Sequence, residues 1–198
     1  INEYGIFKEK DNKKLGGKDE NDVYKVLGLQ YVQPEMRENR GEIEAAQKNA
    51  LPRLVEPGDI KGDLHVHTKQ SDGSHTLEEL IDAARTRGYE YIAITDHSKG
   101  LGIARGLSEE RLLEEKKEVD SLNKKLRGFK LLMGIEVDIR SDGKMDFDDD
   151  ILSKMDIVVA SIHSGFRQPE EQLTGRIVSA MKNPYVSVLC HPTGRIVN

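Results

Sequence analysis

Hydrophobic and polar positions follow a regular alternation from about residue 63 onward. Short runs rich in apolar and β-branched residues alternate there with longer segments in which apolar residues recur every three or four positions. The short runs predict strands and the longer segments predict helices. Alternation of this kind is typical of an α/β domain with a parallel sheet, either open or closed into a barrel. Five strands are predicted, at residues 63–68, 91–95, 129–136, 157–163 and 185–191.

Capping residues define the ends of the predicted helices in this part of the chain. Thr76 and Glu79 have the spacing of a capping box, and Gly88 provides the stop of the same helix. A second helix is predicted from Ser108 to Gly128, and a third from about Glu170 to Lys182. Each predicted strand except the last is therefore followed by helical or turn-forming sequence.

The N-terminal part of the chain is more polar and less regular. It predicts a short strand pair with its turn at Lys13–Gly17, and then a helix that Asp19 can cap. A further helix is predicted at about Gly41–Ala50, and the turn-forming residues around Pro57 interrupt any regular element. We therefore expect two parts, residues 1–58 and residues 59–198.

Composition narrows the class of protein. The 198 residues carry a formal net charge of -5, so neither a basic arm nor a generally basic nucleic-acid scaffold is indicated. No apolar run approaches the roughly 18 residues that a membrane helix needs. The one cysteine, Cys190, permits no disulfide within the chain and suits a reducing cytoplasm. Because the first residue is Ile1 rather than Met, we interpret the chain as part of a longer protein.

Every predicted strand ends in a residue that can bind a metal ion. The C-terminal ends of parallel strands in a β/α barrel lie on one face, so we expect these side chains to converge. His65 and His67 are two residues apart and project from the same face of their strand. Glu136 can bridge two cations, which imidazole cannot, so it is the expected centre of a site with several ions. The candidate ligands at strand ends are His65, His67, His97, Glu136, His163 and His191.

Other polar residues close to these strand ends have two interpretations each. Asp72 can add an oxygen ligand to the site or form an ordinary Asx-turn. Asp96 is expected to have a structural role, and His75 to lie outside the site. Asp146 is expected at the solvated start of a short helix, and Cys190 is expected to be a small buried apolar residue.

A glycine-rich loop after the second strand carries two cations above the expected metal face. Lys99 and Arg105 in this loop, and Arg167 after the fourth strand, are candidates for phosphate binding. Simple solvation at the surface is the alternative for all three.

The metal-capable residues stand in short motifs whose order and spacing are specific. The motifs are Leu64-His65-Val66-His67-Thr68, Ser71-Asp72-Gly73, Ile94-Thr95-Asp96-His97, Gly134-Ile135-Glu136, Ser161-Ile162-His163 and His191-Pro192. Together they resemble the PHP (polymerase and histidinol phosphatase) family over about residues 60–198. The resemblance implies a distorted barrel of seven β/α units, here truncated after the fifth strand, with three metal ions.

The same resemblance implies which residues hold each ion. The first ion takes His65, His67 and Glu136, the second Glu136, His163 and His191, and the third Asp72 and His97. The family's final Asp-x-His pair has no counterpart before residue 198, so only the second ion is expected to have all its protein ligands. Glu136 is the expected catalytic residue, because it would bridge two ions and the attacking water.

The segment in front of this domain resembles the end of the thumb-side subdomain of family X DNA polymerases. This similarity rests on Ile1-Asn2-Glu3-Tyr4-Gly5 and Tyr24-Lys25-Val26-Leu27-Gly28-Leu29, and the junction to a PHP domain on Pro34–Glu38 and Gly41–Ala45. It implies a metal-dependent phosphodiester hydrolase of a repair polymerase, a 3′-5′ exonuclease or abasic-site enzyme. Its partners would be DNA 3′ ends, nicks or gaps, and the polymerase active site is not expected in this chain.

The resemblance implies two or three divalent ions, and the mixture of imidazole and carboxylate ligands suits Mn²⁺ or Zn²⁺ better than Mg²⁺. Two other functions remain open at this point. One is a small-molecule phosphatase of the histidinol-phosphate type, and the other is a non-catalytic, metal-stabilised module that binds DNA.

Overall fold

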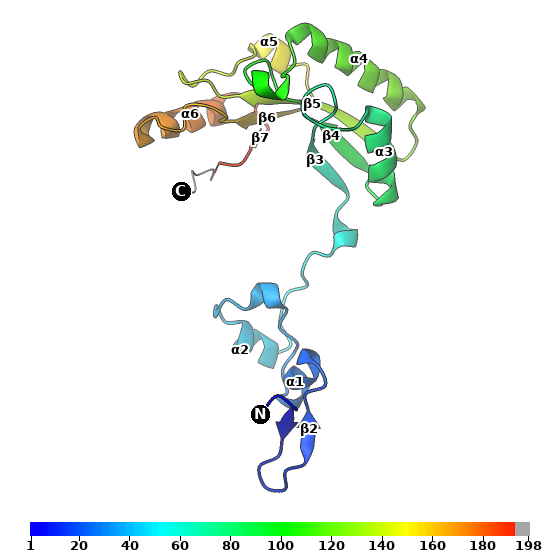
Figure 1. Cartoon of the computed structure of the whole chain (residues 1–198), viewed down its shortest axis with the longest axis vertical. Coiled ribbons are helices and arrows are strands. Elements are labelled where there is room, and N and C mark those ends of the chain that lie inside the picture. Colours follow the sequence, from blue (N-terminus) through cyan, green and yellow to red (C-terminus); the bar gives the residue numbers. More distant parts are fainter. Residues whose placement is uncertain (193–198) are drawn as a thin grey trace. The chain divides into compact units, whose positions relative to one another are not determined.

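The computed structural model describes residues 1–192 and divides the chain into two compact units (Figure 1). The first unit is Ile1–Glu56, and the second begins at Pro57. The candidate metal ligands all belong to the second unit. None of the helices in the described part of the chain has both the length and the apolar character that a membrane-spanning segment requires.

The first unit contains a two-stranded antiparallel sheet and short helices. Asp19 caps α1, as predicted, because its carboxylate accepts a hydrogen bond from the Asp22 backbone N–H. The predicted turn at Lys13–Gly17 is wrong, because part of that segment forms the second strand. The turn lies at residues 8–13, where Asn12 adopts a left-handed φ of 54°. The elements are β1 (Ile6–Phe7), β2 (Lys14–Gly16), α1 (Glu20–Val26), a 3-10 turn (Pro34–Met36) and α2 (Glu42–Gln47).

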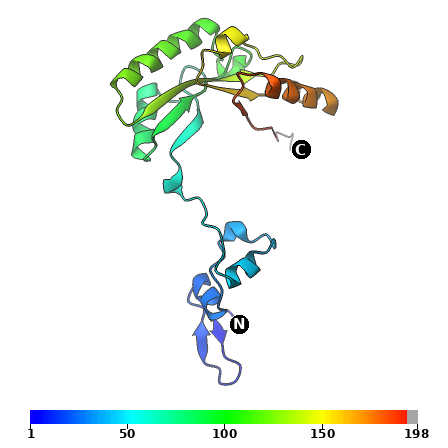
Figure 2. The same ribbon diagram turned by 180° about the vertical axis from the view of Figure 1, so that it is seen from behind.

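The second unit is an α/β domain whose five strands are all parallel and follow the chain order β3-β4-β5-β6-β7. This confirms the predicted fold class and the alternation of strands and helices. Figure 2 shows the sheet and its helices from behind. The strands are β3 (Gly62–Val66), β4 (Tyr91–Ile94), β5 (Lys130–Asp138), β6 (Ile157–Ser161) and β7 (Val188–Leu189). The helices are α3 (Leu77–Thr86), α4 (Glu109–Lys125), α5 (Asp149–Leu152) and α6 (Glu170–Lys182), with 3-10 turns at Pro57–Asp59 and Gly102–Ala104.

Local capping explains where the longer helices begin. Thr76 and Glu79 form the predicted capping box at the start of α3, with both reciprocal hydrogen bonds present. Ser108 caps α4 by accepting a hydrogen bond from the Arg111 backbone N–H. These bonds satisfy backbone donors that have no partner within the first turn of a helix.

β5 is the central strand of the sheet, and its pairing with both neighbours positions Glu136 beside the ends of β4 and β6. It is nine residues long, and its side chains from Met133 to Asp138 are buried. Glu136 pairs with Val159 of β6, and a parallel bridge joins it to His97 beyond the end of β4. Because neighbouring strands are held in this register, the ends of β4, β5 and β6 meet at one edge of the sheet.

The last two predicted strands are shorter than the sequence suggested. β6 ends at Ser161, two residues before His163, and β7 consists of Val188 and Leu189 alone. His191 follows with a left-handed φ of 31°, which turns the chain out of the sheet. His163 and His191 therefore lie on loops just beyond their strands.

Candidate metal centre

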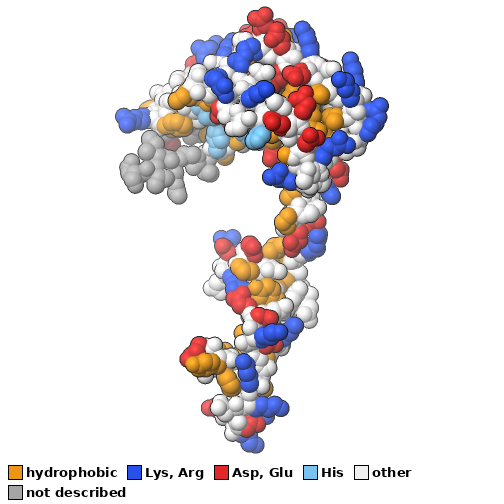
Figure 3. All heavy atoms as spheres, turned by 45° about the vertical axis from the view of Figure 1, so that its right-hand side comes forward, with side chains coloured by type: hydrophobic (Ala, Val, Ile, Leu, Met, Phe, Trp, Pro, Cys, Tyr) orange, Lys and Arg blue, Asp and Glu red, His pale blue; other side chains and the backbone are white. Residues whose placement is uncertain are grey.

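The seven predicted ligands lie in or after each of the five parallel strands, and the five histidines among them converge on the carboxylate of Glu136. Figure 3 shows histidine side chains gathered on the surface of the second unit. The seven predicted ligands are placed as follows: His65 in β3, His67 and Asp72 after β3, His97 after β4, Glu136 in β5, His163 after β6 and His191 after β7.

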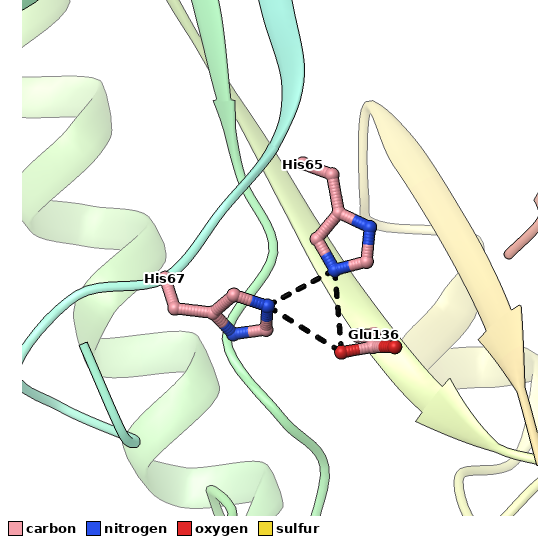
Figure 4. A group of neighbouring side chains, drawn as sticks. All are labelled: His65, His67 and Glu136. Carbon is pink, nitrogen blue, oxygen red and sulfur yellow. Dashed lines mark hydrogen bonds and ion pairs between the residues drawn. The ribbon is translucent and has the colours of Figure 1, made fainter. Parts of the chain in front are cut away.

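One oxygen of Glu136 faces three imidazoles. Glu136 Oε2 is 2.9 Å from His97 Nδ1, 3.3 Å from His65 Nε2 and 3.5 Å from His67 Nε2. The two latter nitrogens also lie 3.0 Å from each other, and both rings point at the carboxylate (Figure 4). Three nitrogens and one oxygen thus surround a small common space.

The other oxygen of Glu136 faces two further imidazoles. Glu136 Oε1 is 3.2 Å from His163 Nε2 and 3.1 Å from His191 Nε2, and it accepts a hydrogen bond of 2.6 Å from the Ser161 hydroxyl. The side chain of Glu136 is 2% exposed. Its two oxygens therefore serve two separate groups of nitrogens from a buried position.

Asp72 extends the cluster toward solvent. Its carboxylate oxygens lie 3.6 Å from His67 Nδ1 and 3.4 Å from His97 Nε2, and its side chain is 48% exposed. His75, in contrast, is exposed and belongs to none of the groups of potential ligands among the described residues.

Four overlapping triplets of potential ligand atoms result from this arrangement, each with its atoms within 4.8 Å of one another. Cys190 belongs to one of them, and its Sγ lies 3.2 Å from His65 Nδ1. Cys190 also packs, partly buried, against the apolar cluster of Ala93, Ile157 and Val159, as expected for a small apolar side chain. The triplets are His65-His67-Glu136, His67-Asp72-His97, His97-Glu136-His163 and Glu136-Cys190-His191.

The chemistry of these atoms fits metal binding. Nδ1 of His67 is buried and makes no hydrogen bond within the described part of the chain, and its nearest carboxylate oxygen, on Asp72, is 3.6 Å away. Buried polar atoms without a partner are rare in proteins, and a cation would satisfy nitrogens and oxygens that face one another. We conclude that the residues present suit divalent ions.

Electrostatics keep the central carboxylate charged. Burial alone would raise the pKa of Glu136, but hydrogen bonds from the surrounding imidazoles, His163 foremost, outweigh it and hold the pKa far below its usual range. Glu136 is therefore an anion throughout the physiological pH range, as a bridging ligand must be.

Asp138, which the sequence interpretation did not include, orients His163. Asp138 Oδ1 lies 2.6 Å from His163 Nδ1, so Nε2 of the same ring is directed at Glu136. The Asp138 backbone N–H donates to Asp146 Oδ1 at 3.1 Å and to Ser98 Oγ at 3.0 Å. The signal for Asp138 was available, since it stands two residues after Glu136 and so on the same face of β5.

The expectation that Asp146 is solvated is wrong. Its side chain accepts hydrogen bonds from the Ser98 hydroxyl at 2.8 Å and from the Gly100 backbone N–H at 2.7 Å. Burial raises the pKa of Asp146 above its usual value, although the hydrogen bonds from Ser98 and Gly100 lower it in part. Asp146 therefore fastens the loop after β4 to the end of β5.

Asp96 fixes the turn that carries Asp72. It is fully buried and accepts hydrogen bonds from the Thr68 backbone N–H at 2.7 Å, the Thr68 hydroxyl at 2.5 Å and the Ser71 hydroxyl at 2.5 Å. The Thr68 hydroxyl also contacts Glu115 Oε1, at 3.2 Å. Burial and the neighbouring charge of Asp96 raise the pKa of Glu115 to about 9, so Glu115 is neutral at pH 7. These contacts agree with the structural role expected for Asp96.

The three phosphate-binding candidates remain predictions. Lys99 Nζ donates to Glu109 Oε1 at 2.8 Å and lies 5.0 Å from the centre of the Phe147 ring. Arg105 is exposed at the end of a 3-10 turn with a left-handed φ of 57°, and Arg167 is exposed beyond β6.

The charge state of His163 gives a prediction for the metal-free protein. The hydrogen bond with Asp138, and then that with Glu136, raise the pKa of His163 from 6.5 to about 9 against the effect of burial. Because the pKa of His163 is higher in the folded than in the unfolded chain, protonated His163 stabilises the fold. This contribution is complete below about pH 6.5 and disappears as the pH rises toward 9. We expect the free energy of unfolding in urea with a chelator to decrease over this interval.

The matched variants for this measurement are His163→Asn and His75→Asn. The first is expected to flatten the pH dependence, whereas the second, on an exposed histidine outside the cluster, is expected to preserve it. An identical pH dependence in wild type and His163→Asn would contradict the assignment.

Comparison with known protein families gives two matches along the chain. Residues 63–190 match the model described as PHP domain, and residues 1–38 match the model described as DNA polymerase beta thumb. The first match contains all candidate ligands except His191.

Among known proteins, the chain is similar to a polymerase and to phosphatases. It is 43% identical over 197 residues to the DNA polymerase/3′-5′ exonuclease PolX of Bacillus subtilis strain 168, covering 100% of this chain and 34% of that protein. It is 34% identical over 135 residues to a protein of Thermoanaerobacter sp. strain X514 named a probable phosphatase, covering 66% of this chain and 53% of that one. The chain thus spans about a third to a half of these relatives.

A solved structure of histidinol phosphate phosphatase from Lactococcus lactis, complexed with zinc, histidinol and phosphate, has a TM-score of 0.40 and 19% identity. It covers 61% of this chain and 52% of that one.

Proposed function

Because this chain belongs to the PHP domain family, we propose that the cluster around Glu136 is a centre of two or three divalent ions that hydrolyses phosphodiester bonds in DNA. The observation that carries this proposal is the shared carboxylate, whose two oxygens each face a separate group of imidazoles. A carboxylate placed in this way can serve two ions at once.

The proposed ligands are the seven predicted residues. Mn²⁺ and Zn²⁺ suit this mixture of imidazole and carboxylate. The chemistry that bound ions supply is Lewis acidity, which activates water for attack on phosphorus and neutralises charge on the phosphate oxygens. The ligands are His65, His67, Asp72, His97, Glu136, His163 and His191.

The chain's own residues position the reacting groups. Glu136 provides a fixed negative charge, and Asp138 holds His163 by its Nδ1 so that Nε2 stays directed inward. Asp96 holds the turn that brings Asp72 over the cluster. Asp72 and His191 are about half exposed, so a substrate can reach the cluster from that side.

DNA is the substrate class that we favour. A relative that matches the whole chain is named a polymerase/3′-5′ exonuclease, and residues 1–38 match a polymerase thumb. We therefore propose that the longer protein presents 3′ ends, nicks or gaps to this centre, in the cytoplasm. A small-molecule phosphatase is the second candidate, because relatives named probable phosphatases match about two thirds of this chain.

Hydrolysis of two substrates by the same preparation separates these candidates. With Mn²⁺ or Zn²⁺, we expect a 3′-recessed DNA duplex to be degraded at a higher kcat/KM than histidinol phosphate is hydrolysed. A chelator is expected to abolish the reaction, and returning the metal is expected to restore it. Preference for histidinol phosphate would favour the second candidate and refute the first.

A further inference from the structure

A polar cleft lies beside the metal centre, at the end of β5. Its volume is about 510 Å³, within the range of pockets that bind small ligands and large enough for one nucleotide unit. Asp138, which contacts His163, forms part of its wall, so the cleft begins where the metal centre ends. Its lining includes Lys99, Asp138, Arg140, Ser141, Asp146 and Ser164.

Arg140 lies on the same side of the extended chain as the metal ligand. Beyond β5 the backbone continues in an antiparallel bridge between Ile139 and Met145, and the Arg140 N–H donates to the Lys144 carbonyl. Side chains in extended chain alternate, so Glu136, Asp138 and Arg140 share one face. At about 3.3 Å per residue, Arg140 stands about 13 Å along the chain from Glu136.

The guanidinium of Arg140 is exposed and is not held by a hydrogen bond or a close ion pair with any described residue. Besides a backbone hydrogen bond, which has the larger effect, its charge helps to lower the pKa of the nearby Asp142 carboxyl group. Lys99, the other cation of the cleft, is already engaged with Glu109 and the Phe147 ring. Arg140 is therefore the cation at this cleft whose hydrogen-bond donors remain available, and its planar group matches the geometry of a phosphate.

The acidic residues around the cleft are each engaged in the fold. Asp138 holds His163, and Asp146 accepts bonds from Ser98 and Gly100. Asp142 accepts a hydrogen bond from the Lys144 backbone N–H. Their charges disfavour a freely diffusing anion, so a phosphate here needs both Arg140 and attachment to a strand that is held at the metal centre.

We propose that this cleft is a subsite for the phosphate next to the scissile one on the substrate strand, and that Arg140 binds it. Arg140 stands too far along the chain from Glu136 to bind the reacting phosphate itself. Its distance suits a contact with the neighbouring phosphate of the same strand. This inference rests on the proposed hydrolysis of DNA and specifies how the strand is placed.

Binding of a single-stranded DNA with a non-hydrolysable linkage at the scissile position, measured in the presence of Mn²⁺, tests the contact without catalysis. Arg140→Ala is expected to weaken binding about tenfold, the loss typical of a charge-assisted hydrogen bond. The slope of log K against log salt should also decrease by about 0.7, corresponding to one phosphate contact. Arg140→Lys should keep the slope but lose part of the affinity, because it keeps the charge and loses the fork.

Lys130→Ala is the matched control. It removes one exposed positive charge from the start of β5, whereas Arg140 lies just beyond the end of that strand. Equal effects of Arg140→Ala and Lys130→Ala on affinity and on salt slope would overturn the proposal.

Hydrolysis of a strand with one neutral methylphosphonate next to the scissile phosphate locates the contact. Wild type should lose about tenfold in kcat/KM on this substrate, whereas Arg140→Ala should cleave both strands equally slowly. An undiminished penalty for the methylphosphonate in Arg140→Ala would overturn the assignment to this phosphate. Failure of wild type to cleave even the unmodified strand would refute the proposed function instead, and the binding measurement would then decide on Arg140.

Discussion

Replacing Glu136 by alanine is expected to reduce hydrolysis of a DNA strand by more than a hundredfold, a larger loss than any single histidine replacement causes. Loss of a residue that only supports a ligand already costs about 10- to 100-fold. Glu136 faces two groups of imidazoles at once, while each histidine belongs to one side of the carboxylate. The measurement is kcat/KM with saturating Mn²⁺, together with the number of bound ions per chain.

Folding of the Glu136→Ala chain should be nearly unaffected, because the side chain lies at the ends of the strands and outside the apolar core. Glu136→Gln keeps the volume but removes the charge, so it should be almost as inactive. Glu90→Ala, which removes an exposed glutamate elsewhere, should retain full activity. Near-normal turnover of Glu136→Ala in a folded protein would eliminate its bridging role.

Replacing Asp138 by alanine is expected to weaken metal binding by about 10- to 100-fold, although Asp138 is not one of the proposed ligands. Without the 2.6 Å contact to Nδ1, the His163 ring loses the partner that fixes its tautomer and its orientation. Asp138→Asn should show a smaller loss, because an amide oxygen still accepts a hydrogen bond but carries no charge. Competition with a chromophoric chelator gives the affinity directly.

Asp148→Asn provides the comparison for this experiment. Asp148 precedes α5 and makes no side-chain capping hydrogen bond, so its replacement should leave metal affinity unchanged. Equal metal affinities for wild type, Asp138→Asn and Asp138→Ala would contradict the role assigned to Asp138.

The sequence predicts the parallel sheet and the candidate ligands because both depend on local patterns. Strand ends are marked by short apolar runs, and parallel strands bring their ends together whatever the details of packing. His65 and His191 could therefore be expected in one place although they are far apart in the sequence. Cys190, the residue before His191, contacts His65 across a separation of 125 residues.

The sequence interpretation failed where distant segments decide the environment. Asp146 looks like a helix start by itself, but the bridge between Ile139 and Met145 folds it back onto Ser98 and buries it. Asp138 was missed because the strand was expected to end at Glu136, whereas it continues for two more residues. The residues next to Asp146 carry no sign of this folding back, whereas the position of Asp138 two residues after Glu136 was a signal that could have been used.

The pairing of β5 with both neighbours limits how this segment can change. Glu136, Asp138 and Arg140 face one way only because the residues between them face the apolar core, as Val137 and Ile139 do. Insertion or deletion of one residue within β5 would exchange the two faces, placing carboxylates in the core and aliphatic side chains toward the histidines. Insertions and deletions during evolution are therefore expected in the connecting loops. Within β5, substitutions are expected, but not insertions or deletions of single residues.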